Sequence, residues 1–217
     1  MCSSDLKTIS NLAAPLCLTT ADGAVIQNLT LGGENFTLAG TAQNYAAFVG
    51  NATGALTIDN CVNNVNVTSS EQRAGGFVGQ VASSQASPGI VTITNSVNNG
   101  TITCTNASTG KSGGLIGYAQ SYSKITFTNS ENNGKVNADM NQVGGFLGMI
   151  YKYGSVTMTN CTNNADISGT CTTGGFLGQS TDDITIEIAN CFNKGNIKAT
   201  KTTDESQCGG LIGLYYN

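Results

Sequence analysis

Apolar and polar residues alternate in short segments that recur along the whole chain. In the segment VTITN (residues 91–95), Val91 and Ile93 are separated and followed by threonines. A period of two is typical of a β-strand with one buried face. The same alternation occurs in five segments, with the apolar pairs Leu56 and Ile58, Val91 and Ile93, Ile125 and Phe127, Val156 and Met158, and Ile186 and Ile188. The pattern predicts equivalent strands, one in each copy of a repeat.

The asparagine that ends each of these segments gives the repeat its length. The intervals between successive asparagines are 35, 34, 31 and 30 residues. Two further apolar columns recur in the same order. One lies seven residues after each asparagine, and the other lies in the motif GGFVG at 75–79 and its later copies at 113–117, 144–148, 174–178 and 209–213. Each copy therefore offers about three short strands, none of which can close a core alone.

Stacking such copies predicts an all-β fold. Each strand would pair in parallel with its equivalent in the next copy, about 4.8 Å away. The result is a parallel β-solenoid (β-helix) with about three short strands per coil of roughly 30 residues, and about six to seven coils. Because the repeat fills nearly the whole chain, we predict a single domain over residues 1–217, with degenerate N-terminal coils over 8–45 and regular coils over 46–217. Asn11 and Asn28 extend the asparagine series at shorter spacing.

Two columns of the repeat are asparagine in five successive copies. An amide carries donor and acceptor groups, so amides stacked in register can hydrogen-bond to one another, and asparagine tolerates the left-handed conformation of a turn. We therefore predict structural ladders; the alternative is a polar row that binds a ligand. Asn160 also begins an N-x-T glycosylation motif, but a ladder position should be inaccessible. The ladders are Asn60, Asn95, Asn129, Asn160 and Asn190, and Asn63, Asn98, Asn132, Asn163 and Asn193.

The recurring elements GGFVG, TITN and NNG together resemble the GLUG motif repeats. The resemblance covers roughly residues 8–217 and rests on the doubled glycines and the spacing of the two asparagines. The GLUG family occurs in extracellular regions of bacterial adhesin-like proteins and of immunoglobulin A-cleaving metallopeptidases. It implies a secreted or cell-surface location and a structural or adhesive role. It implies no peptidase chemistry, because the zinc motif needs histidine and this chain has none.

The composition argues against catalysis. Only 10% of the residues are charged and the net charge is −4, so no basic stripe favours nucleic acid as a partner. No run of 18 apolar residues predicts a membrane span. The acidic pairs Asp182–Asp183 and Asp204–Glu205 lie in variable connections rather than on one strand face, where a general acid and base would be needed. We predict a protein that is not an enzyme and that holds no metal or cofactor.

Eight cysteines form the next candidate group. Cys61, Cys161 and Cys191 share a column with serines, which indicates a position for a small side chain, and we predict free, packed thiols there. Cys171 and Cys208 each precede a doubled glycine, so a disulfide between neighbouring coils is a further hypothesis.

Threonines provide the candidate ligand face. Three successive copies carry a TxT pair that points outward from its strand, and such an array resembles the ice-binding faces of other β-solenoids. The alternative is that threonine is simply a good exposed strand residue. The array ends where the flanking copies read Thr57 with Asp59 and Glu187 with Ala189. A carbohydrate- or ice-binding module is therefore the alternative to a structural or adhesive role, and its candidate ligand face is formed by Thr92, Thr94, Thr126, Thr128, Thr157 and Thr159.

Two features leave alternatives open. Adjacent large residues such as Phe77 and Val78 break strict alternation, so either a glycine corner turns both inward or an apolar stripe faces a partner; the corner is favoured. Both termini also end in mid-pattern without a polar cap. We expect either an excerpt of a longer chain, such as the non-catalytic stalk of a large secreted enzyme, or copies that stack end to end. The expected partners are other copies, other surface proteins or a glycan.

Overall fold

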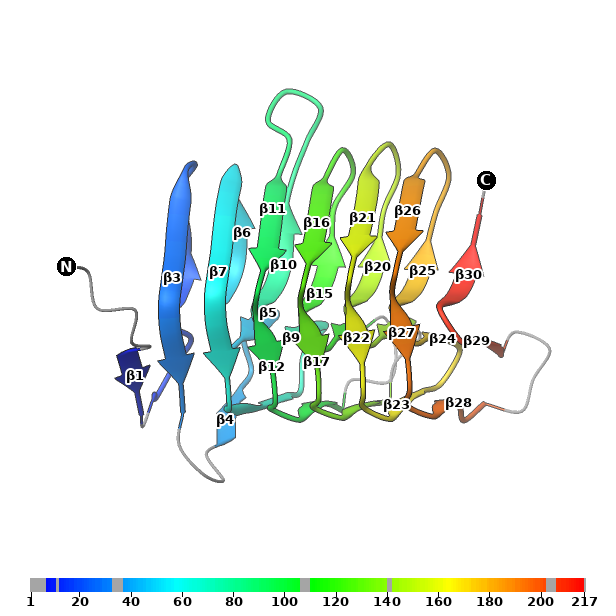
Figure 1. Cartoon of the computed structure of the whole chain (residues 1–217), viewed down its shortest axis with the longest axis horizontal. Coiled ribbons are helices and arrows are strands. Elements are labelled where there is room, and N and C mark those ends of the chain that lie inside the picture. Colours follow the sequence, from blue (N-terminus) through cyan, green and yellow to red (C-terminus); the bar gives the residue numbers. More distant parts are fainter. Residues whose placement is uncertain are drawn as a thin grey trace.

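The computed structural model describes residues 7–10, 12–32, 37–105, 110–139, 142–201 and 206–216. Every regular element in these ranges is a β-strand, and the strands stack in parallel into a solenoid of six turns. The first and last strands, β1 (Lys7–Ile9) and β30 (Ile212–Tyr215), lie toward opposite ends of the long axis (Figure 1). The predicted parallel β-solenoid is therefore confirmed. Asn11, Asp204 and Glu205 lie outside the described residues.

Sheet A contains the predicted alternating strands and bends at the repeated asparagine. One limb holds β11 (Ile90–Thr94), β16 (Lys124–Thr128), β21 (Ser155–Thr159) and β26 (Thr185–Ala189). The other limb holds β1 (Lys7–Ile9), β12 (Val97–Asn98), β17 (Glu131–Asn132), β22 (Thr162–Asn163) and β27 (Phe192–Asn193). The longer strands β3 (Ala24–Leu31) and β7 (Ala55–Asn63) run through both limbs.

Three further sheets complete each turn. Sheet C comprises β4 (Thr37–Gly40), β8 (Asn66–Ser69), β13 (Ile102–Cys104), β18 (Val136–Ala138), β23 (Ile167–Gly169) and β28 (Ile197–Ala199). Sheet D comprises β5 (Asn44–Ala46), β9 (Arg73–Gly75), β14 (Lys111–Gly113), β19 (Gln142–Gly144), β24 (Thr172–Gly174) and β29 (Gln207–Gly209). Sheet B comprises β2 (Cys17–Thr19), β6 (Val49–Thr53), β10 (Val78–Ala82), β15 (Ile116–Ala119), β20 (Leu147–Ile150), β25 (Leu177–Ser180) and β30 (Ile212–Tyr215).

The expected three strands per coil were too few. A regular coil such as the one formed by β16, β17, β18, β19 and β20 has five strands on four sheets. Sheet D was missed because strands such as β14 contain only three residues, Lys-Ser-Gly, and show no apolar alternation. The second limb of sheet A was missed because its strands contain two residues and follow a bend.

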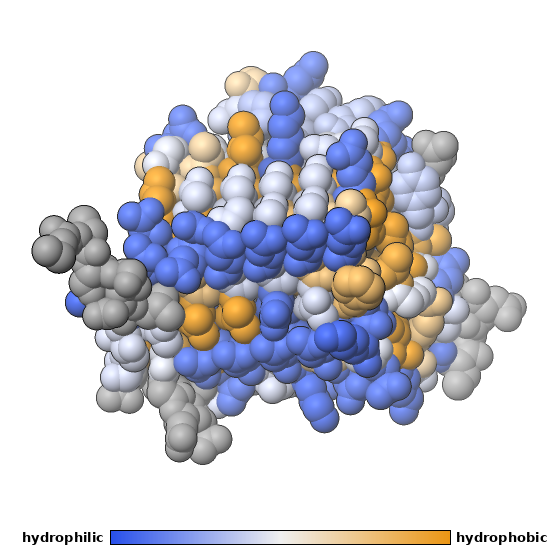
Figure 2. Space-filling view, viewed as in Figure 1, coloured by the Kyte–Doolittle hydropathy of each residue, from blue (hydrophilic) through white to orange (hydrophobic). Residues whose placement is uncertain are grey.

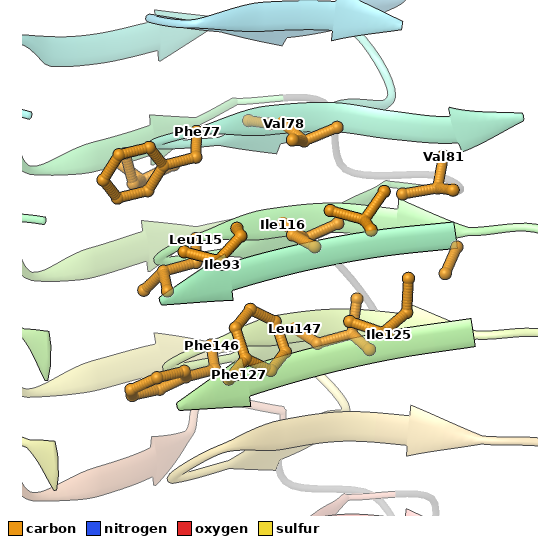
Figure 3. Close-up of a cluster of buried hydrophobic side chains, with 14 of the residues drawn as sticks. Phe77, Val78, Val81, Ile93, Leu115, Ile116, Ile125, Phe127, Phe146 and Leu147 are labelled. Atoms are coloured by element: carbon orange, nitrogen blue, oxygen red, sulfur yellow. The ribbon is translucent and has the colours of Figure 1, made fainter. Parts of the chain in front are cut away.

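Equivalent residues of successive coils lie directly over one another. Ile93 pairs with Ile58 on one side and with Phe127 on the other, so apolar columns run along the axis. The phenylalanine of the GGF motif forms another column, in which the rings of Phe146 and Phe176 are 4.8 Å apart. Figure 3 shows Ile93, Phe127 and Phe146 among the buried side chains that lie between the sheets. In-register stacking therefore converts each repeated apolar position into a continuous core.

The corner at the doubled glycine turns both apolar rows inward. Phe77 lies at the corner between β9 and β10, Val78 begins β10, and both side chains are fully buried. The favoured corner interpretation is confirmed. The last glycine of each motif copy lets sheet B lie directly against sheet D. In the copy at 144–148, a Cβ at Gly148 would stand 2.7 Å from the backbone nitrogen of Ser112. This close approach brings outward-pointing side chains of the two sheets together.

Candidate functional site

The second predicted asparagine column forms a buried ladder. Asn98 donates from Nδ2 to Oδ1 of Asn132 over 2.8 Å, and Asn132 donates to Asn163 over 2.8 Å. Asn63 and Asn193 extend the same series, with bonds of 2.7 Å at each end. The amides also satisfy backbone groups, because Asn98 Nδ2 donates to the carbonyl of Gly100. This geometry supports the structural interpretation of the column, because buried polar groups need such partners.

The first predicted column forms the bend of sheet A. Asn60, Asn95, Asn129, Asn160 and Asn190 all adopt left-handed φ angles, between 48° and 55°. Asn129 and Asn160 each donate to the amide one coil earlier, over 3.2 Å and 3.1 Å. Asn95 instead donates to Asp59. The expectation that Asn160 is inaccessible was wrong: it is exposed, because a residue at a convex bend projects its side chain outward.

A third asparagine ladder was not predicted. Asn99 donates to Asn64 over 2.8 Å, Asn133 donates to Asn99 over 2.9 Å, and Asn164 donates to Asn133 over 2.7 Å. The signal was present in the doubled asparagines at 63–64, 98–99, 132–133 and 163–164. Figure 2 shows hydrophilic bands running along the long axis on this side of the molecule.

The predicted threonine face is assembled in register. Thr92, Thr126 and Thr157 pair in one column, and Thr94, Thr128 and Thr159 pair in the next; all six are partly exposed. Thr57 lengthens the first column by one coil. At the edge of the array, the hydroxyl of Thr94 donates to Asp59 over 2.6 Å. Ice or carbohydrate binding by these columns stays a prediction, because the contacts also fit an ordinary exposed strand surface.

The cysteines have two environments. Cys61 and Cys161 are fully buried and free, Cys191 is a free thiol that is half-buried in the last coil, and the Cys161 thiol bonds to the carbonyl of Thr159. Burial raises the pKa of Cys61, and raises the pKa of Cys161 to about 11. The hypothesis of a Cys171–Cys208 bridge is not supported, because Cys208 is an exposed, free thiol. The register places it opposite Thr173.

Cys208 should therefore react with a thiol reagent about a hundredfold faster than Cys161 in the folded protein at mildly alkaline pH, because only the thiolate is nucleophilic. Mass spectrometry of peptides after timed alkylation measures the two rates. Unfolding in urea provides the control, in which the rates should converge. Equal rates in the folded state would contradict the packed-thiol interpretation.

The carboxylates take part in local structural contacts. Asp182 forms an ion pair with Lys152 at 2.9 Å, and Asp166 accepts two hydrogen bonds from Asn196, which lower the pKa of Asp166. In the described part of the chain, no three His, Cys, Asp or Glu side chains gather as metal ligands. The described ranges also contain no helix long and apolar enough to cross a membrane.

Stacked coils, in-register ladders and a continuous core define a repeat protein of the parallel β-solenoid class. No protein-family model and no curated protein matches the chain. A crystal structure described as that of a putative immunoglobulin A1 protease from Bacteroides ovatus is similar, with a TM-score of 0.59 and 19% sequence identity. The match covers 97% of this chain and 66% of that chain. At this identity the similarity concerns the fold alone.

Proposed function

We propose that this chain is a non-enzymatic structural or adhesive module that is secreted or held at a cell surface. It acts as a rod, and the rod is extended when the last coil pairs with a further coil. The observation that carries the proposal is the apolar face of the last described coil, which matches the faces that join the internal coils. Ile186, Ile188, Ile212 and Tyr215 line an open depression of 290 Å³ there. In the preceding coil, Val156 and Met158 occupy the same positions as Ile186 and Ile188 and are fully buried.

The glycines show how a further coil would fit. A Cβ at Gly145 would lie 2.1 Å from the carbonyl oxygen of Gly175, and a Cβ at Gly175 would lie 2.1 Å from that of Gly210. A Cβ at Gly210 would meet no heavy atom within 4 Å among the described residues. The last coil thus offers the same close-fitting surface as the internal coils. Its strand edges also expose N–H and C=O groups that a parallel strand can pair with.

Gly210→Ala and Ile188→Lys should each abolish self-association while leaving the coils folded. The alanine Cβ stands where an incoming carbonyl would lie, and the lysine places a charge on the apolar end. Sedimentation velocity over a concentration series measures assembly, and circular dichroism checks the fold. Thr157→Lys is the matched control, because it adds the same charge on a lateral face. A wild-type chain that stays monomeric at every concentration would contradict the stacking proposal, and so would unchanged association of both end variants.

The proposal that the chain is not an enzyme rests on the structural contacts of its polar side chains. The amides of the ladders bond to one another, and Asp59, Asp166 and Asp182 are each committed to a structural partner. The similar solved chain is longer than this one and is described as a protease. A non-catalytic stalk within a larger secreted enzyme therefore fits the same observations, and the resemblance to GLUG repeats supports an extracellular setting.

A further inference from the structure

Two cationic side chains lie directly opposite each other on neighbouring coils. Arg73 of β9 pairs with Lys111 of β14 in sheet D, and both are half-buried. Like charges at directly opposed strand positions repel each other. Burial, with a contribution from Arg73, lowers the pKa of Lys111. A bound anion at this position would relieve the repulsion.

The ring of Tyr118, in sheet B, contacts both Arg73 and Lys111. The ring centroid of Tyr118 is 5.0 Å from the guanidinium carbon of Arg73 and 5.5 Å from Nζ of Lys111, which is the geometry of cation–π contacts. Nη1 of Arg73 also donates to Asn44 over 2.9 Å and to Gln80. These contacts preorganise the two cations. Nε of Arg73 is buried and has no hydrogen-bond partner among the described atoms.

Exposed aromatic rings continue this surface toward the turn after β20. Tyr118 pairs with Met149, and Tyr151 follows two residues later on the same outward side, 39% exposed. Tyr153 is 51% exposed, and its ring stacks on that of Tyr122 with centroids 5.1 Å apart. The surface therefore combines preorganised positive charge with flat apolar faces.

The backbone at two of these tyrosines is strained. Tyr122 and Tyr153 have φ angles of 66° and 62°, in the left-handed region that bulky side chains rarely adopt. The next coil has Asp183 in this conformation, with φ 57°, and a short polar residue tolerates it at a lower cost. Strain of this kind is concentrated at functional sites, which supports a role for the two rings beyond forming the turn.

We propose that Arg73 and Lys111, with the exposed rings of Tyr151 and Tyr153, form a binding site for an acidic polysaccharide, with sugar carboxylates on the cations and sugar rings stacked on the tyrosines. Charge-assisted hydrogen bonds from arginine suit a carboxylate. The flat ring faces favour a sugar over an acidic peptide, which needs only the charges. The site uses internal coils, so it goes beyond the proposed function and does not depend on end-to-end stacking.

Isothermal titration calorimetry with galacturonic acid oligomers tests the site on the full chain. Lys111→Gln should weaken binding about tenfold or more, because one charge-assisted contact is lost; Gln142 already occupies this column in the next coil. Tyr153→Asn should weaken binding similarly while keeping or raising thermal stability, because asparagine relieves the left-handed strain. Lys135→Gln is the control: it removes the same charge at an exposed position outside the proposed site, where Lys135 faces Asp166 at 3.9 Å.

Neutral galactose oligomers should bind at least tenfold more weakly than the uronate, and added salt should weaken uronate binding. The proposal is overturned by absence of uronate binding, or by equal losses in Lys111→Gln and Lys135→Gln. It is also overturned if polyglutamate binds as tightly as the uronate and Tyr153→Asn has no effect, which would indicate an acidic protein partner.

Discussion

Asn132→Asp is expected to lower the free energy of unfolding by about 3 to 5 kcal/mol, because it leaves an uncompensated charge in the buried ladder. Asn132 is fully buried and donates from Nδ2 to Oδ1 of Asn163. A carboxylate at this position has no proton to donate, so two oxygens would face each other across 2.8 Å. The loss is large because the ladder allows neither amide to turn toward water.

Urea unfolding followed by circular dichroism measures this change. Asn133→Asp is the matched control one residue away: Asn133 is exposed and makes the same kind of bond, to Asn99 over 2.9 Å. Because water can solvate the carboxylate there, we expect a change of about 1 kcal/mol or less. A similar loss of unfolding free energy in the two variants would show that burial does not determine how much the ladder contributes to stability.

Gly145→Ala should destabilise the protein by about 3 kcal/mol or more, because the added methyl group overpacks the contact between two coils. Its Cβ would lie 2.1 Å from the carbonyl oxygen of Gly175 and 2.8 Å from Cγ of Asn163. Both neighbours are fixed, one in the backbone and one in the buried ladder. Relief therefore requires the two coils to separate and the parallel hydrogen bonds between them to lengthen.

Gly210→Ala tests whether this cost arises from the neighbouring coil. Gly210 occupies the same motif position in the last coil and has open space where the Cβ would be placed. Its substitution should leave the urea midpoint of a dilute sample within the error of the wild-type value. A midpoint for Gly145→Ala equal to that of Gly210→Ala would contradict the role of the glycine in coil contact.

The fold was predictable because each copy of the sequence repeat forms one coil of the structure. When copies stack in register, a residue that recurs in the sequence recurs as a column, so Ile93 and Phe127 could be placed together without coordinates. The short strands of sheet D were not predictable in this way. Residues such as Lys111 and Gly113 have no shared hydrophobic pattern, and their strand conformation follows from the neighbouring coils.

The candidate sites were only partly predictable for a related reason. Periodicity placed the threonine columns and the buried asparagines, since these depend on contacts between equivalent positions. The cluster of Arg73, Lys111 and Tyr118 depends instead on contact between sheets B and D. Nothing in the spacing of the repeat fixes the angle at which those sheets meet. That angle follows from the absence of a Cβ at glycines such as Gly148.

Each internal coil contacts chiefly the coil before it and the coil after it, through parallel strands of matching register. Inserting or deleting one whole coil therefore leaves the surroundings of distant coils unchanged and alters the length of the molecule by about 4.8 Å. The reach of such a protein can thus be adjusted in small, equal steps by changing the number of copies in its gene.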